Sequence, residues 1–237
     1  MKSEIIVEIG QNHDGYISKA KELIYAAKEN GGDVAKFQLF NAKKLFKRKN
    51  NKWFDYNCKC ELSLKQLYEI KETCDKVKIE FMASVFDLER FNWLKKINVK
   101  RFKIASRSIE DTNLISNVIN ENKPVIVSLG FWKKEKLPNF QPCKKIFYLF
   151  CISDYPTAIK KINFNTIDFK KYNGFSDHTV GVEASMIALS RGASIIEKHF
   201  TIDKKSYGPD HNCSMTPDEL KLLANYKKIT DITLKKI

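Results

Sequence analysis

The sequence predicts an α/β fold, a single-domain (β/α)8 barrel that spans residues 1–237. Short apolar segments alternate with segments of helical periodicity, which is the pattern of repeated βα units. There are eight apolar segments, and no glycine-rich phosphate fingerprint follows the first of them. Both observations favour a closed parallel barrel over an open doubly wound sheet. With 43% hydrophobic residues, a chain of this length can bury one good-sized core.

Each predicted strand is a run of apolar residues, many of them β-branched or aromatic. The eight runs are residues 4–10, 34–38, 80–86, 101–106, 124–130, 146–153, 172–178 and 193–200. Helices are predicted over residues 18–30, 63–76, 87–97, 108–120, 182–191 and 216–235. The last begins with "TPDE", in which Thr216 can cap, Pro217 suits the first helical position and Glu219 completes a capping box. The connections 131–144, which contains two prolines, and 156–171 are weak as helices.

The composition indicates which classes of protein this chain does not belong to. No apolar run reaches the eighteen or so residues that span a bilayer, and "MKSEIIVEIG" is too short and acidic for a signal peptide. We therefore expect a soluble, cytoplasmic protein without membrane contact. The six cysteines, at 58, 60, 74, 143, 151 and 213, lack the spacing of a zinc or redox site, which predicts reduced thiols.

The formal net charge of +14 raises the question of nucleic-acid binding. The lysines are spread along the chain, with one denser run, "KKLFKRKNNK" at 43–52. We interpret this run as a solvated loop, and the alternative is a funnel for an anionic small molecule or a partner patch. No nucleic-acid partner is expected.

Polar residues interrupt or end the predicted strands on their carboxyl side. They are Glu8, Lys36, Gln38, Ser84, Lys103, Ser106, Ser128, Ser153, Ser176, His178, Glu197 and His199. In a parallel barrel these ends converge on one face, and that face carries the active site. The sequence therefore predicts that these side chains surround one pocket.

Two histidines, His178 and His199, end the predicted seventh and eighth strands, which are neighbours in a closed barrel. Two neutral imidazoles with waters or substrate oxygens can make an open site for a divalent ion, whereas a single histidine is more often structural. Asp177 or Glu197 is a candidate to orient a ring through its other nitrogen.

Lys36 and Lys103 lie within otherwise apolar strands, where an ammonium group needs an anion. One interpretation is a buried ion pair with Glu8, and the other is a clamp for a phosphate or carboxylate, helped by serine hydroxyls. A Schiff-base lysine is a third option.

Asp210, in "SYGPDHNCSM", either belongs to a plain loop or projects over the barrel mouth to bind sugar hydroxyls. Asn12, His13 and Asp14 are expected to form a turn.

These motifs together resemble the sialic acid synthases, also called N-acetylneuraminate synthases. The resemblance is carried, in the family's order, by "EIGQNHDG", "AKFQ", "FKIAS", "FSDHT", "EKHFT" and "GPDHNCSM". It implies a (β/α)8 barrel transferase that condenses phosphoenolpyruvate with an N-acyl amino sugar, N-acetylmannosamine or a related deoxy sugar. The products would be a nonulosonic acid and phosphate, for surface glycan biosynthesis. A different aldose acceptor and a non-catalytic sugar-phosphate-binding barrel are the alternative functions.

The resemblance also implies roles for single residues. His178 and His199 match the ligands of a divalent metal, typically Mn²⁺, with Mg²⁺ or Co²⁺ as alternatives. Glu8, Lys103 and His199 are the predicted catalytic residues. The predicted substrate-binding residues are Lys36, Gln38, Ser84, Ser106, Ser128, Tyr155, Ser176 and Asp210.

The chain departs from the family's pattern in three places. Arg107 and Ser108 follow "FKIAS" where the family has Gly-Glu, and Glu110 comes two residues late. Ser153 replaces an asparagine near the sugar. Family members also pair as dimers and continue into an antifreeze-like domain that supplies an arginine to the partner's site, whereas this sequence ends at Ile237. We therefore expect a homodimer whose site is less covered or is covered by another chain.

Overall fold

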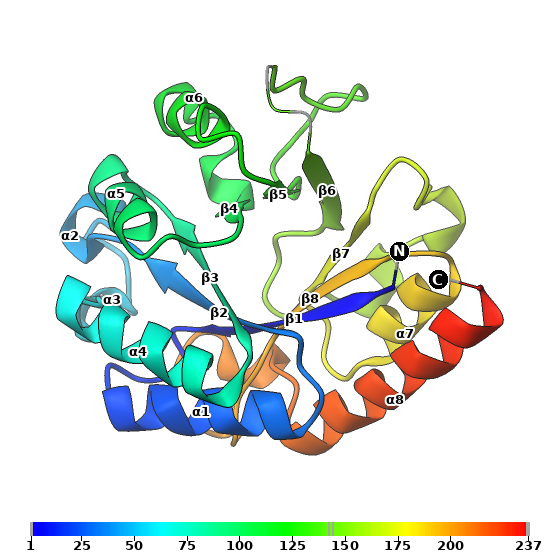
Figure 1. The fold of residues 1–237 in the computed structure, drawn as a ribbon, viewed down its shortest axis with the longest axis horizontal. Helices are drawn as coiled ribbons and strands as arrows, with labels where there is room; N and C mark the ends of the chain where they lie inside the picture. The colour runs from blue at the N-terminus through cyan, green and yellow to red at the C-terminus, as the bar shows by residue number, and fades with distance from the viewer. Residues whose placement is uncertain (1, 142, 144, 236–237) are drawn as a thin grey trace.

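A computed structural model describes residues 2–141, 143 and 145–235, in which eight parallel strands close into a barrel in chain order (Figure 1). The strands are β1 (Glu4–Gly10), β2 (Val34–Leu39), β3 (Glu80–Val85), β4 (Phe102–Ile104), β5 (Val125–Ser128), β6 (Ile146–Cys151), β7 (Gly174–Asp177) and β8 (Ile195–His199). The prediction of a (β/α)8 barrel and of its eight strands is confirmed. Several strands are shorter than predicted, so that His178 lies one residue beyond β7.

In the described part of the chain, six helices of eight or more residues surround the barrel (Figure 1). They are α1 (Ile17–Glu29), α4 (Leu64–Val77), α5 (Leu88–Lys96), α6 (Thr112–Ile119), α7 (Glu183–Ser190) and α8 (Pro217–Thr233). The capping box predicted for α8 is present, with Thr216 and Glu219 as its two members. Helix α6 begins four residues later than predicted, because Asp111 caps it and the 3-10 turn η1 (Ser106–Ser108) precedes it.

The two connections that are weak as helices contain no α-helix in their described residues. The first links β5 to β6, and the second links β6 to β7 through the 3-10 turns η2 (Ile159–Lys161) and η3 (Phe164–Thr166). Another 3-10 turn, η4 (His211–Cys213), precedes α8. The outer layer is therefore helical over only part of the barrel (Figure 1).

The connection between β2 and α4 carries two short helices, α2 (Ala42–Leu45) and α3 (Phe54–Lys59), which the sequence analysis missed. Residues 43–52 are thus only partly the solvated loop that was predicted. Phe40 and Tyr56 anchor a small apolar cluster in this connection, and Phe46 and Trp53 pack against it. This cluster fixes one wall of the barrel mouth.

The barrel interior is apolar at the amino ends of the strands. A compact cluster there consists of Ile6, Val34, Met82, Ile126, Leu149 and Ile195. Each of these residues precedes a polar or thiol residue by two positions, namely Glu8, Lys36, Ser84, Ser128, Cys151 and Glu197. Because alternate residues of a strand face the same side, the apolar layer forms the base on which the polar side chains stand.

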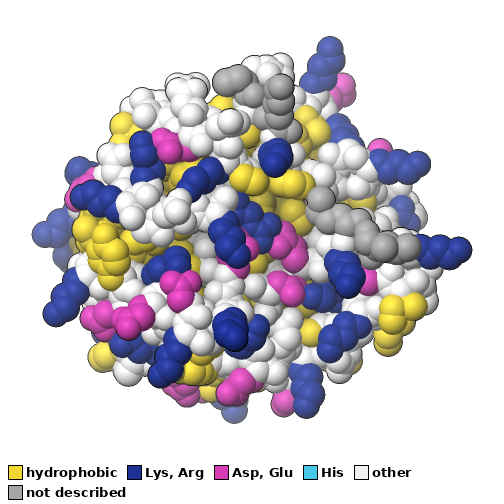
Figure 2. Space-filling view, in the orientation of Figure 1, with side chains coloured by type: hydrophobic (Ala, Val, Ile, Leu, Met, Phe, Trp, Pro, Cys, Tyr) yellow, Lys and Arg dark blue, Asp and Glu magenta, His cyan; other side chains and the backbone are white. Residues whose placement is uncertain are grey.

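Other features of the fold bear on the predictions from composition. All six cysteines are unpaired, as predicted. No helix within the described residues is long and apolar enough to cross a membrane. On the face shown in Figure 2, Lys and Arg side chains are spread among Asp and Glu and do not form one stripe.

Candidate active site

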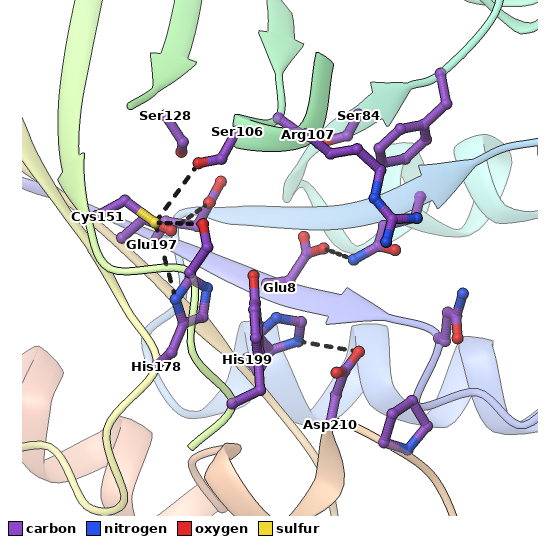
Figure 3. Close-up of a pocket in the computed structure, with 18 of the residues that line it drawn as sticks. Glu8, Ser84, Ser106, Arg107, Ser128, Cys151, His178, Glu197, His199 and Asp210 are labelled. Carbon is purple, nitrogen blue, oxygen red and sulfur yellow. Dashed lines mark hydrogen bonds and ion pairs between the residues drawn. The ribbon is translucent and has the colours of Figure 1, made fainter. Parts of the chain in front are cut away.

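A cavity of about 460 Å³ opens at the carboxyl ends of the strands (Figure 3). Every residue that the sequence predicts for the site lines it: Glu8, Lys36, Gln38, Ser84, Lys103, Ser106, Ser128, Tyr155, Ser176, His178, His199 and Asp210. The convergence expected from strand polarity is therefore present. The roles of these residues remain predictions.

Four buried charges alternate across the base of the cavity. Lys36 Nζ lies 2.6 Å from Glu8 Oε2 and 3.6 Å from Glu197 Oε2, and Lys103 Nζ lies 3.6 Å from Glu197 Oε1. The strand register explains this order, since Glu8 is the partner of Lys36 on one side and of His199 on the other. The ion pair between Lys36 and Glu8 considered in the sequence analysis is present, and it is part of a larger network.

Burial and charge shift the pKa values of this network in different directions. Burial raises the pKa of Glu8 in spite of the opposing effect of Lys36. Burial also opposes the charge of Glu197, but Lys103 and Lys36 hold its pKa down at about 2. Burial lowers the pKa of Lys103, although the negative charge of Glu197 opposes this effect. For Lys36 the charges of Glu197 and Glu8 outweigh burial, and its pKa is raised. Glu197 is therefore the firmly ionised centre, and Glu8 is the carboxyl group most easily protonated.

Short polar side chains hold these charges in place. Lys36 donates to Ser84 Oγ at 3.0 Å, and Lys103 donates to Ser128 Oγ at 2.7 Å. Ser176 donates to Glu197 Oε1 at 2.9 Å, and the amide of Gln38 donates to Glu8 Oε1 at 2.8 Å. Each lysine thus has a hydroxyl on the next strand that fixes its ammonium group.

The two predicted metal ligands lie side by side at the cavity wall. The ring centroids of His178 and His199 are 5.7 Å apart, and the ring of Tyr155 lies 4.1 Å from the first and 5.9 Å from the second. Both histidines are buried. No group of three or more His, Cys, Asp or Glu side chains in the described part of the chain is arranged to hold a metal ion. The protein offers two imidazoles, so any bound ion would need water or substrate oxygens as further ligands.

The ring nitrogens have different surroundings. His178 Nδ1 lies 2.9 Å from the carbonyl oxygen of Ile152, so this nitrogen carries a proton, and in the neutral ring Nε2 has the lone pair. Burial opposes a charge on His178, but Cys151 and the Ile152 carbonyl outweigh it and raise its pKa. His199 Nδ1 is buried without a hydrogen-bond partner, and Asp210 Oδ2 is 3.8 Å away. Burial, against the effect of Asp210, lowers the pKa of His199 to about 4. His199 is therefore neutral at pH 7, as a metal-binding imidazole must be.

The prediction that Asp177 or Glu197 orients an imidazole ring is wrong. Glu197 is engaged by Ser176 and the two lysines. Asp177 points away from the cavity, where it accepts from Ser185 at 2.6 Å and pairs with Lys198 at 3.1 Å. Since Asp177 and Lys198 alternate with the inward residues of their strands, this second ion pair is on the helix side of the sheet.

The turn predicted at Asn12–Asp14 has a structural role. Asn12 donates to the carbonyl of Phe200 and to Ser214, each at 2.8 Å. Asp14 accepts from Tyr56 at 2.6 Å and contacts His211 Nε2 at 3.1 Å. These contacts join the loop after β1 to the loops after β2 and β8, which stabilises the wall of the cavity.

The cavity also has lining residues to which the sequence analysis gave no role. Cys151 Sγ lies 3.6 Å from Ser106 Oγ and 3.8 Å from His178 Nδ1 (Figure 3). Its spacing from Leu149 follows the inward alternation, which would have predicted its position. Phe46 and Trp53 come from the connection between β2 and α4, and Arg107 comes from η1. No local pattern predicts that these distant segments meet.

Comparisons with known proteins agree with this architecture. An uncharacterized protein from Methanocaldococcus jannaschii is 38% identical over 96% of this chain and 70% of its own length. An N,N'-diacetyllegionaminic acid synthase from Legionella pneumophila is 35% identical over 92% of this chain and 69% of its own. The crystal structure of an N-acetylneuraminic acid synthetase from Leptospira borgpetersenii superposes with a TM-score of 0.92 at 30% identity, covering 99% of this chain and 85% of that one.

The barrel, its polar carboxyl face and these relatives define a class of enzyme, the transferases that form a carbon–carbon bond in sugar-acid synthesis. Within that class the family model for the NeuB family matches residues 23–236. The chain belongs to the NeuB family, and the resemblance found in the motifs is confirmed.

Proposed function

We propose that this protein condenses phosphoenolpyruvate with an N-acyl amino sugar and releases phosphate and a nonulosonic acid. The observation that carries the proposal is the union, in one cavity, of a pair of neighbouring histidines with two lysines fixed by hydroxyl groups. The names of the relatives, legionaminic acid and N-acetylneuraminic acid synthases, support the same type of reaction. We further propose that the reaction serves surface glycan biosynthesis.

A divalent ion, Mn²⁺ in our proposal, fits the histidine pair. His199 is neutral and has a buried ring nitrogen without a partner, and the Ile152 carbonyl fixes the tautomer of His178. When bound by these two rings, the ion would supply Lewis-acid polarisation of the sugar aldehyde.

Lys36 and Lys103 would bind the anionic groups of phosphoenolpyruvate. Two ammonium groups face the cavity from β2 and β4, and Ser84 and Ser128 hold them in place. Ser106, whose hydroxyl accepts from the backbone N–H of Gly130 at 2.9 Å, is a further contact on the same wall. Preorganised donors of this kind stabilise the negative charge on the departing phosphate.

Glu8 would act as the base that accepts the proton of the attacking water. As carbon 3 of phosphoenolpyruvate bonds to the aldehyde carbon, the aldehyde oxygen becomes an alkoxide that takes up a proton, and positive charge develops at carbon 2. Water adds at carbon 2 and loses a proton, and the bond between carbon 2 and the phosphate oxygen then breaks to give the 2-keto acid and phosphate. The raised pKa of Glu8 suits a carboxylate that accepts a proton, and Gln38 and Lys36 keep it oriented. Tyr155 and Asp210, on the histidine side of the cavity, would contact the sugar.

Phosphate release from phosphoenolpyruvate by the purified protein tests this function. The assay compares N-acyl hexosamines with Mn²⁺ present and with a chelator added. We expect metal-dependent release with one or a few sugars, and loss of that release in His199→Ala. Release that is unchanged in His199→Ala would overturn the metal assignment, and no release with any sugar would overturn the synthase.

A further inference from the structure

Among the described residues that line the cavity, Arg107 is the Lys or Arg side chain without a carboxylate partner. The lysines among the lining residues, Lys36, Lys103 and Lys198, each have a carboxylate within 4.0 Å, from Glu8, Glu197 or Asp177. Among the described residues, no Asp or Glu oxygen lies within 4.0 Å of the Arg107 guanidinium, and its side chain is exposed to solvent. Its hydrogen-bonding capacity is therefore free for a ligand.

The position of Arg107 is nevertheless fixed. The turn η1 carries it directly after Ser106, and its guanidinium carbon lies 5.1 Å from the ring centroid of Phe46. Phe46 is itself held edge-on against the buried ring of Phe40, with centroids 5.5 Å apart. Stacking uses the face of the guanidinium group and leaves its N–H edge available, an edge that matches carboxylate and phosphate oxygens.

Arg107 is far from the groups assigned to the reacting atoms. Figure 3 shows it across the cavity from Cys151 and His178, with Glu8 between them. An anion bound by Arg107 would thus belong to the part of the acceptor remote from the aldehyde. In the proposed reaction the lysines at the base of the cavity bind the phosphate and carboxylate of phosphoenolpyruvate.

We propose that Arg107, stacked on Phe46, is a specificity-determining residue that selects an acceptor sugar carrying a negatively charged substituent, a phosphate or a carboxylate. This inference rests on the proposed function, because it concerns the acceptor of that reaction. A single charge-assisted contact of this kind changes kcat/KM about ten- to a hundredfold.

The experiment compares three probes: N-acetylmannosamine, its 6-phosphate and its uronic acid. Wild type is assayed with phosphoenolpyruvate and Mn²⁺, and product formation is followed by mass spectrometry. We expect kcat/KM to favour at least one anionic probe about ten- to a hundredfold, mainly through KM, and the favoured probe identifies the anionic group. In Arg107→Gln this ratio should fall toward one, and Arg107→Lys should retain part of it.

Arg48→Gln is the matched control. Arg48 is also stacked, 4.4 Å from the ring of Phe54, but it pairs with Asp55 at 2.9 Å and does not line the cavity. This variant should keep the wild-type ratio. A wild type that prefers the neutral sugar, or an anionic preference that survives in Arg107→Gln, would overturn the inference.

A calorimetric titration separates this inference from the proposed function. The three probes are added to wild type and Arg107→Gln in EDTA with phosphoenolpyruvate present, so that no turnover is required. Suppose that no sugar is converted, but wild type binds an anionic probe more tightly than the neutral sugar and Arg107→Gln does not. The proposed reaction then fails, and the role of Arg107 stands. Equal affinities in the two proteins, or no binding of any probe, would refute the role of Arg107.

Discussion

Glu8 Oε2 lies 2.6 Å from Lys36 Nζ, and the two residues are also register partners in the parallel pair of β1 and β2. Both side chains are only 3% exposed. Neighbouring strands thus bring opposite charges to the same depth of the barrel, where each charge compensates the burial of the other.

Lys36→Met should lower the free energy of unfolding by about 3–5 kcal/mol, because Glu8 loses its closest cation in a buried position. Urea unfolding followed by circular dichroism measures the loss. The double variant Glu8→Gln/Lys36→Met should regain part of it. Lys43→Met, at an exposed position of α2, is the control and should change stability by less than about 0.5 kcal/mol. A single variant as stable as wild type would contradict the structural importance of the pair.

His178→Ala and His199→Ala should each weaken Mn²⁺ binding at least about tenfold, since each removes one of two proposed protein ligands. Calorimetry or the electron paramagnetic resonance signal of free Mn²⁺ gives the dissociation constant. His13→Gln is the matched control, because His13 is also buried and neutral but does not line the cavity. Wild-type affinity in either alanine variant would remove that histidine from the metal site.

The contribution of His13 to stability should fall as the pH decreases from about 6.5 to 4. Burial lowers the pKa of His13 to about 4, so in this range the unfolded chain binds a proton that the folded protein does not. The contribution is fully present above the ordinary histidine pKa and is lost as the pH falls, at up to about 1.4 kcal/mol per pH unit for one group. His199, whose pKa is also lowered to about 4, should act in the same direction in metal-free protein.

His13→Gln should therefore reduce the slope of unfolding free energy against pH between about 6.5 and 4. The measurement is urea unfolding at several pH values in EDTA. Any pH-independent cost of the substitution appears equally at pH 7.5 and does not affect the slope. An unchanged slope would mean that His13 binds protons equally in both states.

Lys198→Met should destabilise the protein by about 3–5 kcal/mol, because it leaves the fully buried Asp177 without its ammonium partner. This pair lies on the helix side of the sheet, so kcat/KM of the folded fraction should stay close to wild type. Lys36→Met should lose both stability and turnover. Loss of turnover in Lys198→Met without a change in its unfolding curve would place Lys198 in the reaction instead.

The sequence by itself determined the barrel fold and which residues lie on its polar face. Apolar residues two positions before Glu8, Lys36 and Glu197 predict which side chains point inward. Parallel strands bring their carboxyl ends to one face, and therefore His178 and His199 could be expected near each other without coordinates. The cap of α8 was equally predictable, because Thr216, Pro217 and Glu219 interact within one turn.

Only the tertiary structure decided which of these side chains contact one another. Glu197 faces two lysines and not an imidazole, because strand register and side-chain length, which the sequence does not give, set the distances at the barrel base. Arg107 meets Phe46 because two segments about sixty residues apart in sequence pack at the same wall. Periodicity reports which side of an element a residue faces, whereas contacts between distant elements depend on how the whole chain packs.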